Sequence, residues 1–200
     1  MDDDVPSGID LRDPNDAAVW AREADVKRPW RAEMRAAIAD RVHAAGARRV
    51  LELGSGPGLL AEAVLSTCSV DEYVLFDFSP PMLDMSRTRV GAREAARFVL
   101  GDFKQPRWTE ALHGPFDAVV TMQAVHEIRH KRHVPGLYRE LRALVAGVLL
   151  VSDHDPPDDS ARFTALHSTQ AEQHAALASA GFVDVRTELV LHGLYLIVAR

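Results

Sequence analysis

The sequence predicts an α/β fold in which a mostly parallel sheet is covered by helices on both faces. From Arg48 onward, short apolar segments alternate with segments of helical spacing, a pattern typical of parallel sheets. A glycine-rich segment lies where the first predicted strand turns into a helix. Segments such as Val148–Ser152 are almost wholly apolar, as expected for strands buried on both faces. The 200 residues suit one domain with a full core.

Two segments are expected to precede the sheet. Residues 1–14 carry three consecutive Asp and two Pro, which predicts a poorly ordered acidic tail. Residues 15–46 are expected to form an N-terminal helical cap, with a short helix over about 15–26 and a longer one after it. The longer helix carries an apolar residue at every fourth position: Trp30, Met34, Ile38 and Val42.

The strands and helices of the main domain are expected within residues 47–200. The predicted strands cover residues 50–53, 73–77, 97–100, 117–121, 148–152, about 182–189 and about 194–199. The predicted helices cover residues 57–67, 79–90, 134–145 and 169–180, and Ser79 is the expected N-cap of the second of these. No helix separates the last two strands, so they should be antiparallel neighbours.

Composition and charge exclude several classes of protein. The chain has 23 Lys+Arg and 29 Asp+Glu, and its net charge of −6 argues against non-specific nucleic-acid binding. No apolar run approaches the roughly 20 residues that a membrane-spanning helix needs. The N-terminus has no apolar segment of the kind found in secretory signals, and the single Cys68 allows no internal disulfide. We therefore expect a cytoplasmic protein, and the sequence carries no signal for an oligomeric state.

The glycine-rich segment Glu52–Gly58 is the strongest indication of a ligand site. Its glycines allow positive φ angles and close approach of a ligand to the backbone, and the helix that follows favours a negatively charged group. Asp77 ends the second predicted strand, 19 residues after Gly58, where its carboxylate can accept hydrogen bonds from both hydroxyls of a ribose. Asp102 follows the third predicted strand, and its carboxylate can accept a hydrogen bond from the amine of an adenine.

In their order and spacing these motifs resemble the class I S-adenosylmethionine-dependent methyltransferases. The resemblance rests on five segments: VLELGSGPG (50–58), LFDFSPPML (75–83), GDF (101–103), FDAVVTMQAVHEI (116–128) and LVAGVLLVSD (144–153). It spans about residues 48–200 and implies a doubly wound, Rossmann-like sheet of seven strands with an antiparallel last strand. It also implies S-adenosylmethionine as cofactor, bound at the carboxyl ends of the first four strands, and methyl transfer to a small-molecule acceptor.

The same resemblance implies a set of cofactor-binding residues. Around the methionine part they are Glu52, Gly54, Ser55, Gly56 and Gly58. At the ribose and adenine they are Asp77, Phe78, Met82, Asp102 and Phe103. Beside the sulfonium they are Met122 and Gln123.

Methyl transfer needs a base only if the acceptor must lose a proton, because the cofactor carries its own activation. His126 follows the fourth predicted strand, where many family members carry a histidine, and is the predicted catalytic base and an acceptor contact. His154, after the fifth predicted strand, is the second candidate for the base and a further expected acceptor contact. Trp20 and Arg28 are expected to belong to a lid over the acceptor, whereas Trp30 heads the apolar stripe and is expected to pack in the core. The segment 155–168 is short, which predicts an open site, and oxygen, nitrogen and carbon acceptors all remain possible.

Three other functions fit parts of the sequence. Residues 126–130 match H-E-x-x-H, the zinc metalloprotease pattern, but they lie in a predicted loop and Gly136 stands where a third histidine should be. We therefore expect no metal ligands, beyond incidental affinity from His126, His130 and His133. A nicotinamide-dependent dehydrogenase would need its third glycine one residue after Gly58. A non-catalytic module that binds S-adenosylmethionine stays open.

Overall fold

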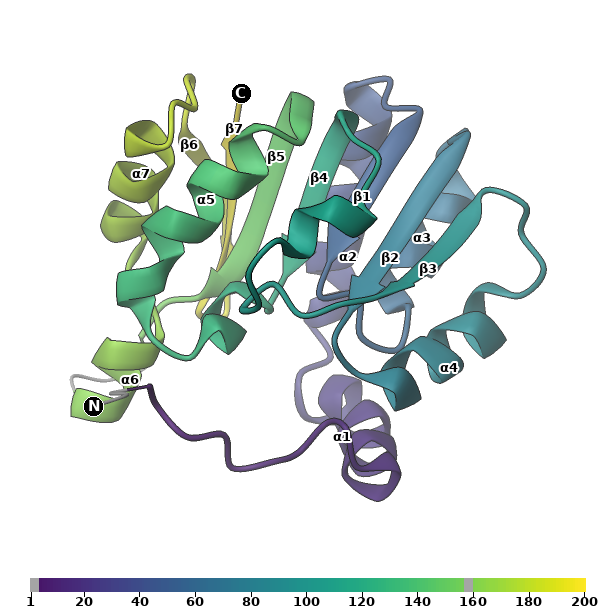
Figure 1. Cartoon of the computed structure of the whole chain (residues 1–200), viewed down its shortest axis with the longest axis horizontal. Helices are drawn as coiled ribbons and strands as arrows, with labels where there is room; N and C mark the ends of the chain where they lie inside the picture. Colours follow the sequence, from purple (N-terminus) through teal and green to yellow (C-terminus); the bar gives the residue numbers. More distant parts are fainter. Residues whose placement is uncertain (1–3, 157–159) are drawn as a thin grey trace.

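A single sheet of seven strands forms the centre of the protein in the computed structural model, which describes residues 4–156 and 160–200 (Figure 1). The strands are β1 (Arg49–Leu53), β2 (Glu72–Asp77), β3 (Ala96–Leu100), β4 (Phe116–Met122), β5 (Val145–His154), β6 (Arg186–Leu191) and β7 (Leu194–Ala199). Their order is β3-β2-β1-β4-β5-β7-β6. Strands β1 to β5 are parallel, and β7 is antiparallel to both β5 and β6, which confirms the predicted fold class.

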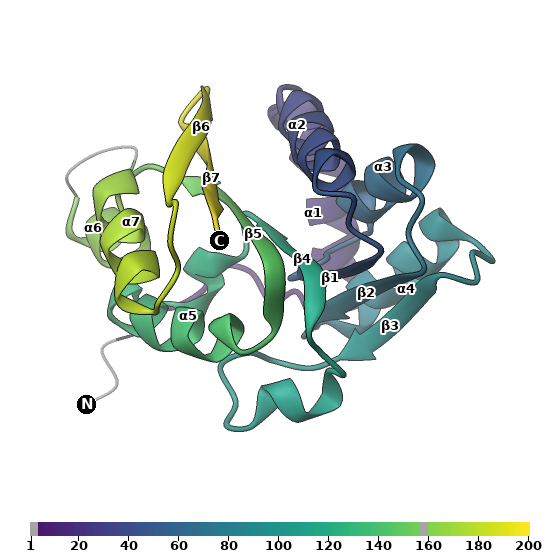
Figure 2. The same ribbon diagram turned by 90° about the horizontal axis from the view of Figure 1, so that it is seen from above.

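Helices cover both faces of the sheet, as Figure 2 shows from above. The α-helices are α1 (Pro14–Lys27), α2 (Arg31–Ala44), α3 (Leu59–Thr67), α4 (Pro80–Val90), α5 (Val134–Arg142), α6 (Ala161–Leu166) and α7 (Gln170–Ser179). The short 3-10 helices are η1 (Trp108–Ala111), η2 (Val125–Ile128) and η3 (Lys131–His133). One apolar cluster joins the sheet to α5 and α7, and a second joins it to α2, α3 and α4.

Helix α2 belongs to the core layer, whereas the sequence suggested a cap. Its apolar residues Met34, Ile38 and Val42 are fully buried and share one cluster with Leu60 and Val64 of α3. Helix α1 has few buried residues and lies beyond the sheet's edge, beside the site described below (Figure 1). The apolar stripe of α2 packs against the sheet, so α2 is part of the core and not of a cap. Of the two predicted cap helices, α1 alone lies beside the site.

The strand predicted over residues 182–189 begins later, at Arg186. Phe182 is buried against α7, and Asp184 has a φ of 49°, which turns the chain before the strand can start. The ladder to β7 then runs from Arg186 to Leu191. The apolar alternation used for the prediction did not reveal this turn, since Asp adopts positive φ without a glycine signal.

Residues 4–13, called the strap below, differ from the expected poorly ordered tail, whose first three residues lie outside the described part. The strap crosses the carboxyl edge of the sheet and leads into α1 (Figure 1). The Arg129 guanidinium donates to the carbonyls of Val5 and Pro6, and the Ser79 hydroxyl donates to the Leu11 carbonyl. These contacts hold the strap because they satisfy backbone carbonyls that would otherwise need water.

The strand order reverses between β1 and β4, and this reversal places the site. In open α/β sheets the helices that follow these two strands lie on opposite faces, which leaves a crevice at the carboxyl ends. The loops after β1, β2, β4 and β5 all meet there. Within the described ranges, no helix combines the length and the apolar character that crossing a bilayer requires.

Candidate functional site

A cavity of about 720 Å³ occupies the crevice at the carboxyl ends of the strands. Its walls come from the strap, from α1 and α2, and from the loops after β1, β2, β4 and β5. Arg162, Phe163 and Leu166 of α6 close another side. The predicted open site is therefore narrowed by the strap and α6, two elements that sequence spacing did not identify as walls. The predicted residues that line it are Trp20, Glu52, Gly54, Ser55, Gly56, Asp77, Phe78, Met82, Phe103, Met122, Gln123, His126 and His154.

The glycine-rich loop after β1 is held by backbone hydrogen bonds to β2. The N–H groups of Gly54 and Ser55 both donate to the Phe76 carbonyl, at 2.8 and 3.1 Å. Gly54 and Gly56 have φ angles of 72° and 52°, which favour glycine over other residues. A side chain at Gly56 would meet nothing within 4 Å, so this part of the loop faces open space that a ligand can fill.

Gly54 has a second constraint, because a Cβ there would lie 2.3 Å from the Cβ of Ala124. We expect Gly54→Ala to lower the free energy of unfolding by about 2–4 kcal/mol, from backbone strain and the clash together. Chemical denaturation measures this loss. Gly46→Ala is the matched control, since Gly46 has a φ of 61° but open space around it. Equal losses in the two variants would contradict the clash.

Asp77 lies at the end of β2 with its carboxylate turned to the loop. One oxygen accepts from the Gly56 N–H at 2.7 Å and the other from the Ser79 N–H at 2.9 Å. Burial raises the pKa of Asp77 to about 6, although these two N–H donors favour the ionised form. The side chain thus positions the loop, and its remaining lone pairs are available to hydroxyl groups of a ligand.

Glu52 ends in the same cavity and is almost fully buried. Burial raises its pKa to about 8, while the hydrogen bond from the Tyr73 hydroxyl at 2.8 Å works in the opposite direction. At neutral pH the ligand-free protein therefore holds Glu52 mainly in its protonated form. A cation bound beside it would restore the carboxylate.

Two predicted residues do not line the cavity. Asp102 pairs with Arg12 of the strap at 3.1 Å and accepts from the Lys104 N–H, so it lies beside a smaller neighbouring hollow. Gly58 caps α3 with a φ of 82°, and a Cβ there would lie 2.9 Å from Ser86. The third glycine thus allows α3 and α4 to approach each other closely.

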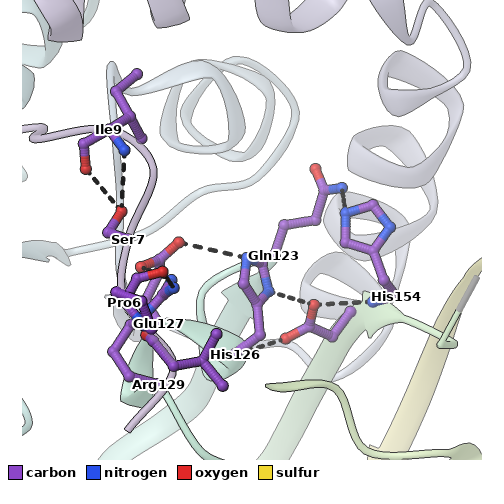
Figure 3. A network of polar contacts seen from close by, with 10 residues as sticks. Pro6, Ser7, Ile9, Gln123, His126, Glu127, Arg129 and His154 are labelled. Atoms are coloured by element: carbon purple, nitrogen blue, oxygen red, sulfur yellow. Dashed lines mark hydrogen bonds and ion pairs between the residues drawn. The ribbon is translucent and has the colours of Figure 1, made fainter. Parts of the chain in front are cut away.

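His126 lines the same cavity and belongs to a chain of alternating charges. Its Nδ1 is 2.7 Å from the Asp153 carboxylate, and its Nε2 is 3.4 Å from the Glu127 carboxylate. Arg129 pairs with Glu127 at 3.1 Å and continues to the strap, as Figure 3 shows. Burial works to lower the pKa of His126, but the carboxylates of Asp153 and Glu127 outweigh it and hold the pKa well above 6.5.

His154 differs from His126 in charge. Burial lowers its pKa to about 4, so it is neutral at physiological pH. Its Nε2 is 2.5 Å from the side-chain amide of Gln123, which holds the neutral ring in place (Figure 3). Gln123 itself has a φ of 57°, an uncommon backbone for a residue that is not glycine.

Comparison with known proteins gives this geometry a family. A sequence profile described as a methyltransferase domain matches residues 50–147. The demethylmenaquinone methyltransferase of Deinococcus radiodurans is 34% identical over 142 residues, which are 70% of this chain and 55% of that protein. Human N-acetylserotonin methyltransferase, solved in complex with S-adenosylmethionine (SAM), has a TM-score of 0.71 at 17% identity, covering 95% of this chain and 57% of that one. The chain thus spans little more than half the length of these two relatives.

A further structure agrees in architecture over most of both chains. Magnesium protoporphyrin IX methyltransferase from Synechocystis PCC 6803 was solved with bound S-adenosylhomocysteine (SAH). It has a TM-score of 0.67 at 16% identity, over 86% of this chain and 84% of that one. The motif order, the strand order and these matches agree. The chain belongs to the class I S-adenosylmethionine-dependent methyltransferase family. The dehydrogenase interpretation of the glycine-rich loop is thereby excluded.

The H-E-x-x-H pattern of this methyltransferase family member does not form one helix face. The 3-10 helix η2 ends at Ile128, and Arg129 follows with a φ of 73°. His126 faces Asp153 in the cavity, whereas His130 contacts His133 at the surface of η3, with ring centroids 6.3 Å apart. The three histidines named for incidental metal affinity therefore do not gather.

Another group comes closer to a metal-binding arrangement. His126, Asp153 and His167 place ligand atoms within 4.8 Å of one another. Asp153, however, already accepts hydrogen bonds from the His126 ring and from the backbone N–H groups of His126 and His154. The absence of metal ligands stays a prediction.

Sequence reasoning missed His167 and Arg31, which also line this methyltransferase cavity. His167 comes after α6, and its Nδ1 is buried without a hydrogen-bond partner among the described residues. No sequence motif marks it. Arg31 could have been noticed, because with Arg35 it falls on the apolar face of α2, where a charged residue is unusual.

Proposed function

We propose that this chain transfers a methyl group from SAM to an ionisable hydroxyl of a small molecule. The observation that carries the proposal is the His126–Asp153 pair, 2.7 Å apart, in the same cavity as the glycine-rich loop. When bound, SAM supplies a methyl group already activated on a sulfonium sulfur. The task left to the protein is to bind, to orient and to accept a proton.

The residues of the cavity fit the cofactor. Gly54 and Gly56 provide backbone that a ligand can approach, and Asp77 offers carboxylate oxygens for the ribose hydroxyls. Glu52 offers a buried carboxyl for the methionine ammonium. The buried Ser55 hydroxyl has no partner within the described chain, which is the state expected of a group that awaits a ligand.

At the acceptor end, Asp153 orients His126. It accepts from the ring Nδ1–H, so Nε2, which faces the Glu127 carboxylate at 3.4 Å, is the atom that takes the acceptor's proton once the ring is neutral. Neutral His126 would be a strong base because its pKa is raised. His154 and Gln123 border the same space as neutral polar groups, and Trp20 and Arg28 form its cap side. The network supports an oxygen nucleophile over one that needs no base.

Release of SAH in the presence of a panel of small phenols and hydroquinones tests this function. The panel is incubated with SAM, and product is identified by mass spectrometry. Turnover of a hydroxyl acceptor that falls sharply in His126→Ala is the expected result. Tight SAM binding with no turnover of any acceptor would favour the non-catalytic module instead.

Binding of SAH should depend on pH through Glu52. Below about pH 8 the free carboxyl must lose its proton when the ammonium binds, so affinity should rise by up to tenfold per unit from pH 6 to pH 8. Above about pH 8 affinity should fall again, because a free α-amino group loses its own proton there. Isothermal titration calorimetry across this range measures the profile.

Glu52→Gln is the control for that profile. It keeps an acceptor for the Tyr73 hydroxyl and removes the titration, so the rise between pH 6 and pH 8 should become shallow. The raised pKa also means that ionising Glu52 destabilises the ligand-free fold, and this cost grows as pH rises from 4.5 towards 8. Glu52→Gln should therefore raise the melting temperature at pH 8. An unchanged binding profile would remove Glu52 from the ammonium site.

A further inference from the structure

Arg31 is a buried cation, and two of its three side-chain nitrogens have no hydrogen-bond partner among the described residues. The residue is 6% exposed, and its Nε and Nη1 are buried with no hydrogen bond to any described residue. Its guanidinium lies over the Trp20 ring at 5.3 Å, and its Nη1 is 3.8 Å from Asp25. That distance is too long for a hydrogen bond.

Asp25 does not neutralise Arg31, because it serves another arginine. Arg35 takes both oxygens of the Asp25 carboxylate, at 3.0 and 2.6 Å. Two guanidinium groups thus share one negative charge, and Arg28 adds a third positive charge to the same wall. Glu52 adds little compensation in the ligand-free protein, since burial keeps it mainly protonated at neutral pH.

Burying a charge whose hydrogen-bonding atoms lack partners costs several kcal/mol, so the unpartnered atoms of Arg31 need an explanation, and a bound ligand is one that fits a residue in the cavity wall. Arg31 and its neighbour Trp30 both line the cavity, and the indole Nε1 of Trp30 is a further buried donor without a partner among the described residues. The unpartnered atoms of Arg31 and Trp30 are all donors. They match an anion with several acceptor oxygens, and a guanidinium fits a carboxylate best.

The place of Arg31 in the cavity wall determines which ligand carboxylates could contact its guanidinium. The charge of Arg35 acts on Glu52 at the methionine end, and the charge of Arg28 acts on His154 at the acceptor end. Arg31 itself lines the same cavity as Glu52 and His154. The two sources of a carboxylate are therefore the methionine part of the cofactor and an acidic group on the acceptor.

We propose that Arg31, assisted by Trp30, forms a carboxylate-binding subsite in the wall of the cavity. The subsite rests on the proposed function, because its ligand is the cofactor or the acceptor of that reaction. The subsite would bind a ligand carboxylate, a group for which none of the predicted site residues is a partner. The cation stays buried without a full counter-ion until that carboxylate arrives.

Calorimetry with two matched ligands tests the cofactor arm. The ligands are SAH and the analogue of SAH that keeps the amine and lacks the carboxylate. Arg31→Met should weaken SAH binding by about tenfold, the effect of one lost charge-assisted interaction, and leave the analogue unchanged. Arg31→Lys should recover only part of the loss, because an ammonium lacks the guanidinium fork. Arg22→Met, at an exposed position of α1 outside the cavity, is the control and should change neither affinity.

A second pair of ligands tests the acceptor arm. Binding of 4-hydroxybenzoate and 4-hydroxybenzamide is measured with and without saturating SAH. A preference of the wild type for the benzoate that disappears in Arg31→Met, with SAH affinity unchanged, would assign the subsite to the acceptor. If neither ligand pair distinguishes Arg31→Met from the wild type, the subsite does not exist.

Two further outcomes separate this proposal from its alternatives. A purely structural Arg31 would lower the melting temperature of Arg31→Met and weaken every ligand equally, which would overturn the subsite. A binding role predicts an unchanged or higher melting temperature, because a buried unpaired charge has been removed. If wild-type protein bound no SAH, the proposed function would fail, while the benzoate comparison on the ligand-free protein would still decide the subsite.

Discussion

His126→Ala should reduce methyl transfer to a hydroxyl acceptor by about 10²–10⁴-fold, the range typical of a lost general base. SAH affinity should stay within about twofold, because the side chain of His126 pairs with Asp153 and Glu127, neither of which is proposed to hold the cofactor. Initial rates with a phenolic acceptor and calorimetry with SAH measure the two quantities. His174→Ala is a matched control, since His174 bonds Thr187 away from the cavity and should leave the rate unchanged.

The pH dependence of the same rate adds a second test. His126 must be neutral to accept a proton, and Asp153 and Glu127 hold its pKa above 6.5. The rate should therefore rise with pH through the alkaline range in which His126 loses its proton. Asp153→Asn removes one of these carboxylates, so the rise should move to lower pH while the maximal rate falls. A rate independent of pH, and insensitive to His126→Ala, would indicate an acceptor that needs no base.

Asp77→Ala should weaken SAH binding by about 1.5–3 kcal/mol, or about 10- to 150-fold, because hydrogen bonds to a charged group are lost. The structure adds a second cause. The Asp77 carboxylate also holds the Gly56 N–H at 2.7 Å, so its removal releases the glycine-rich loop. Calorimetry with SAH measures the affinity, and the melting temperature of the ligand-free protein reports the loop.

Asp77→Asn separates the two causes. The asparagine keeps one oxygen for a backbone N–H and loses the charge and the second acceptor oxygen. We expect it to retain most of the melting temperature and still to bind SAH at least tenfold more weakly, on the scale of one charge-assisted hydrogen bond. Affinity within twofold of the wild type in both variants would show that Asp77 does not hold the ribose.

Local signals in the sequence were sufficient for the elements of the fold. Ser79 accepts from the Met82 N–H as the N-cap of α4, and Thr169 forms a full capping box at the start of α7. The apolar segments that became β1, β2, β4 and β5 are buried on both faces, as their composition indicated. These features depend on neighbours within a few residues, so the chain itself contains them.

The cofactor side of the candidate site was also readable from the sequence. The glycine-rich loop follows β1 and the acidic residue ends β2, the neighbouring strand of the sheet. The length of the helix between the two strands therefore fixes the spacing of these motifs in the sequence. Glu52, Gly54, Gly56 and Asp77 line the cavity as this spacing implied. Asp102 and Gly58 are the exceptions: Asp102 pairs with the strap residue Arg12 from 90 positions away, and Gly58 caps α3.

Only the tertiary structure decided the charges at the acceptor end. His126 and His154 look equivalent in sequence, as loop histidines after neighbouring strands. Asp153 and Glu127 raise the pKa of the first, and burial without a close carboxylate partner of its own lowers the pKa of the second. Such pKa shifts depend on burial and on the distance to groups far apart in the chain, and no local pattern records either.

The sequence by itself therefore determined the α/β sheet, the place of the candidate site and the family of the protein, since each depends on periodicity and on motif spacing. The strap over the site, the buried Arg31 and the His126–Asp153 pair came only from the folded chain. The contacts of the strap join residues up to 129 positions apart, as for Asp4 and His133. Such contacts are selected by the packing of the whole domain, which short-range propensity does not encode.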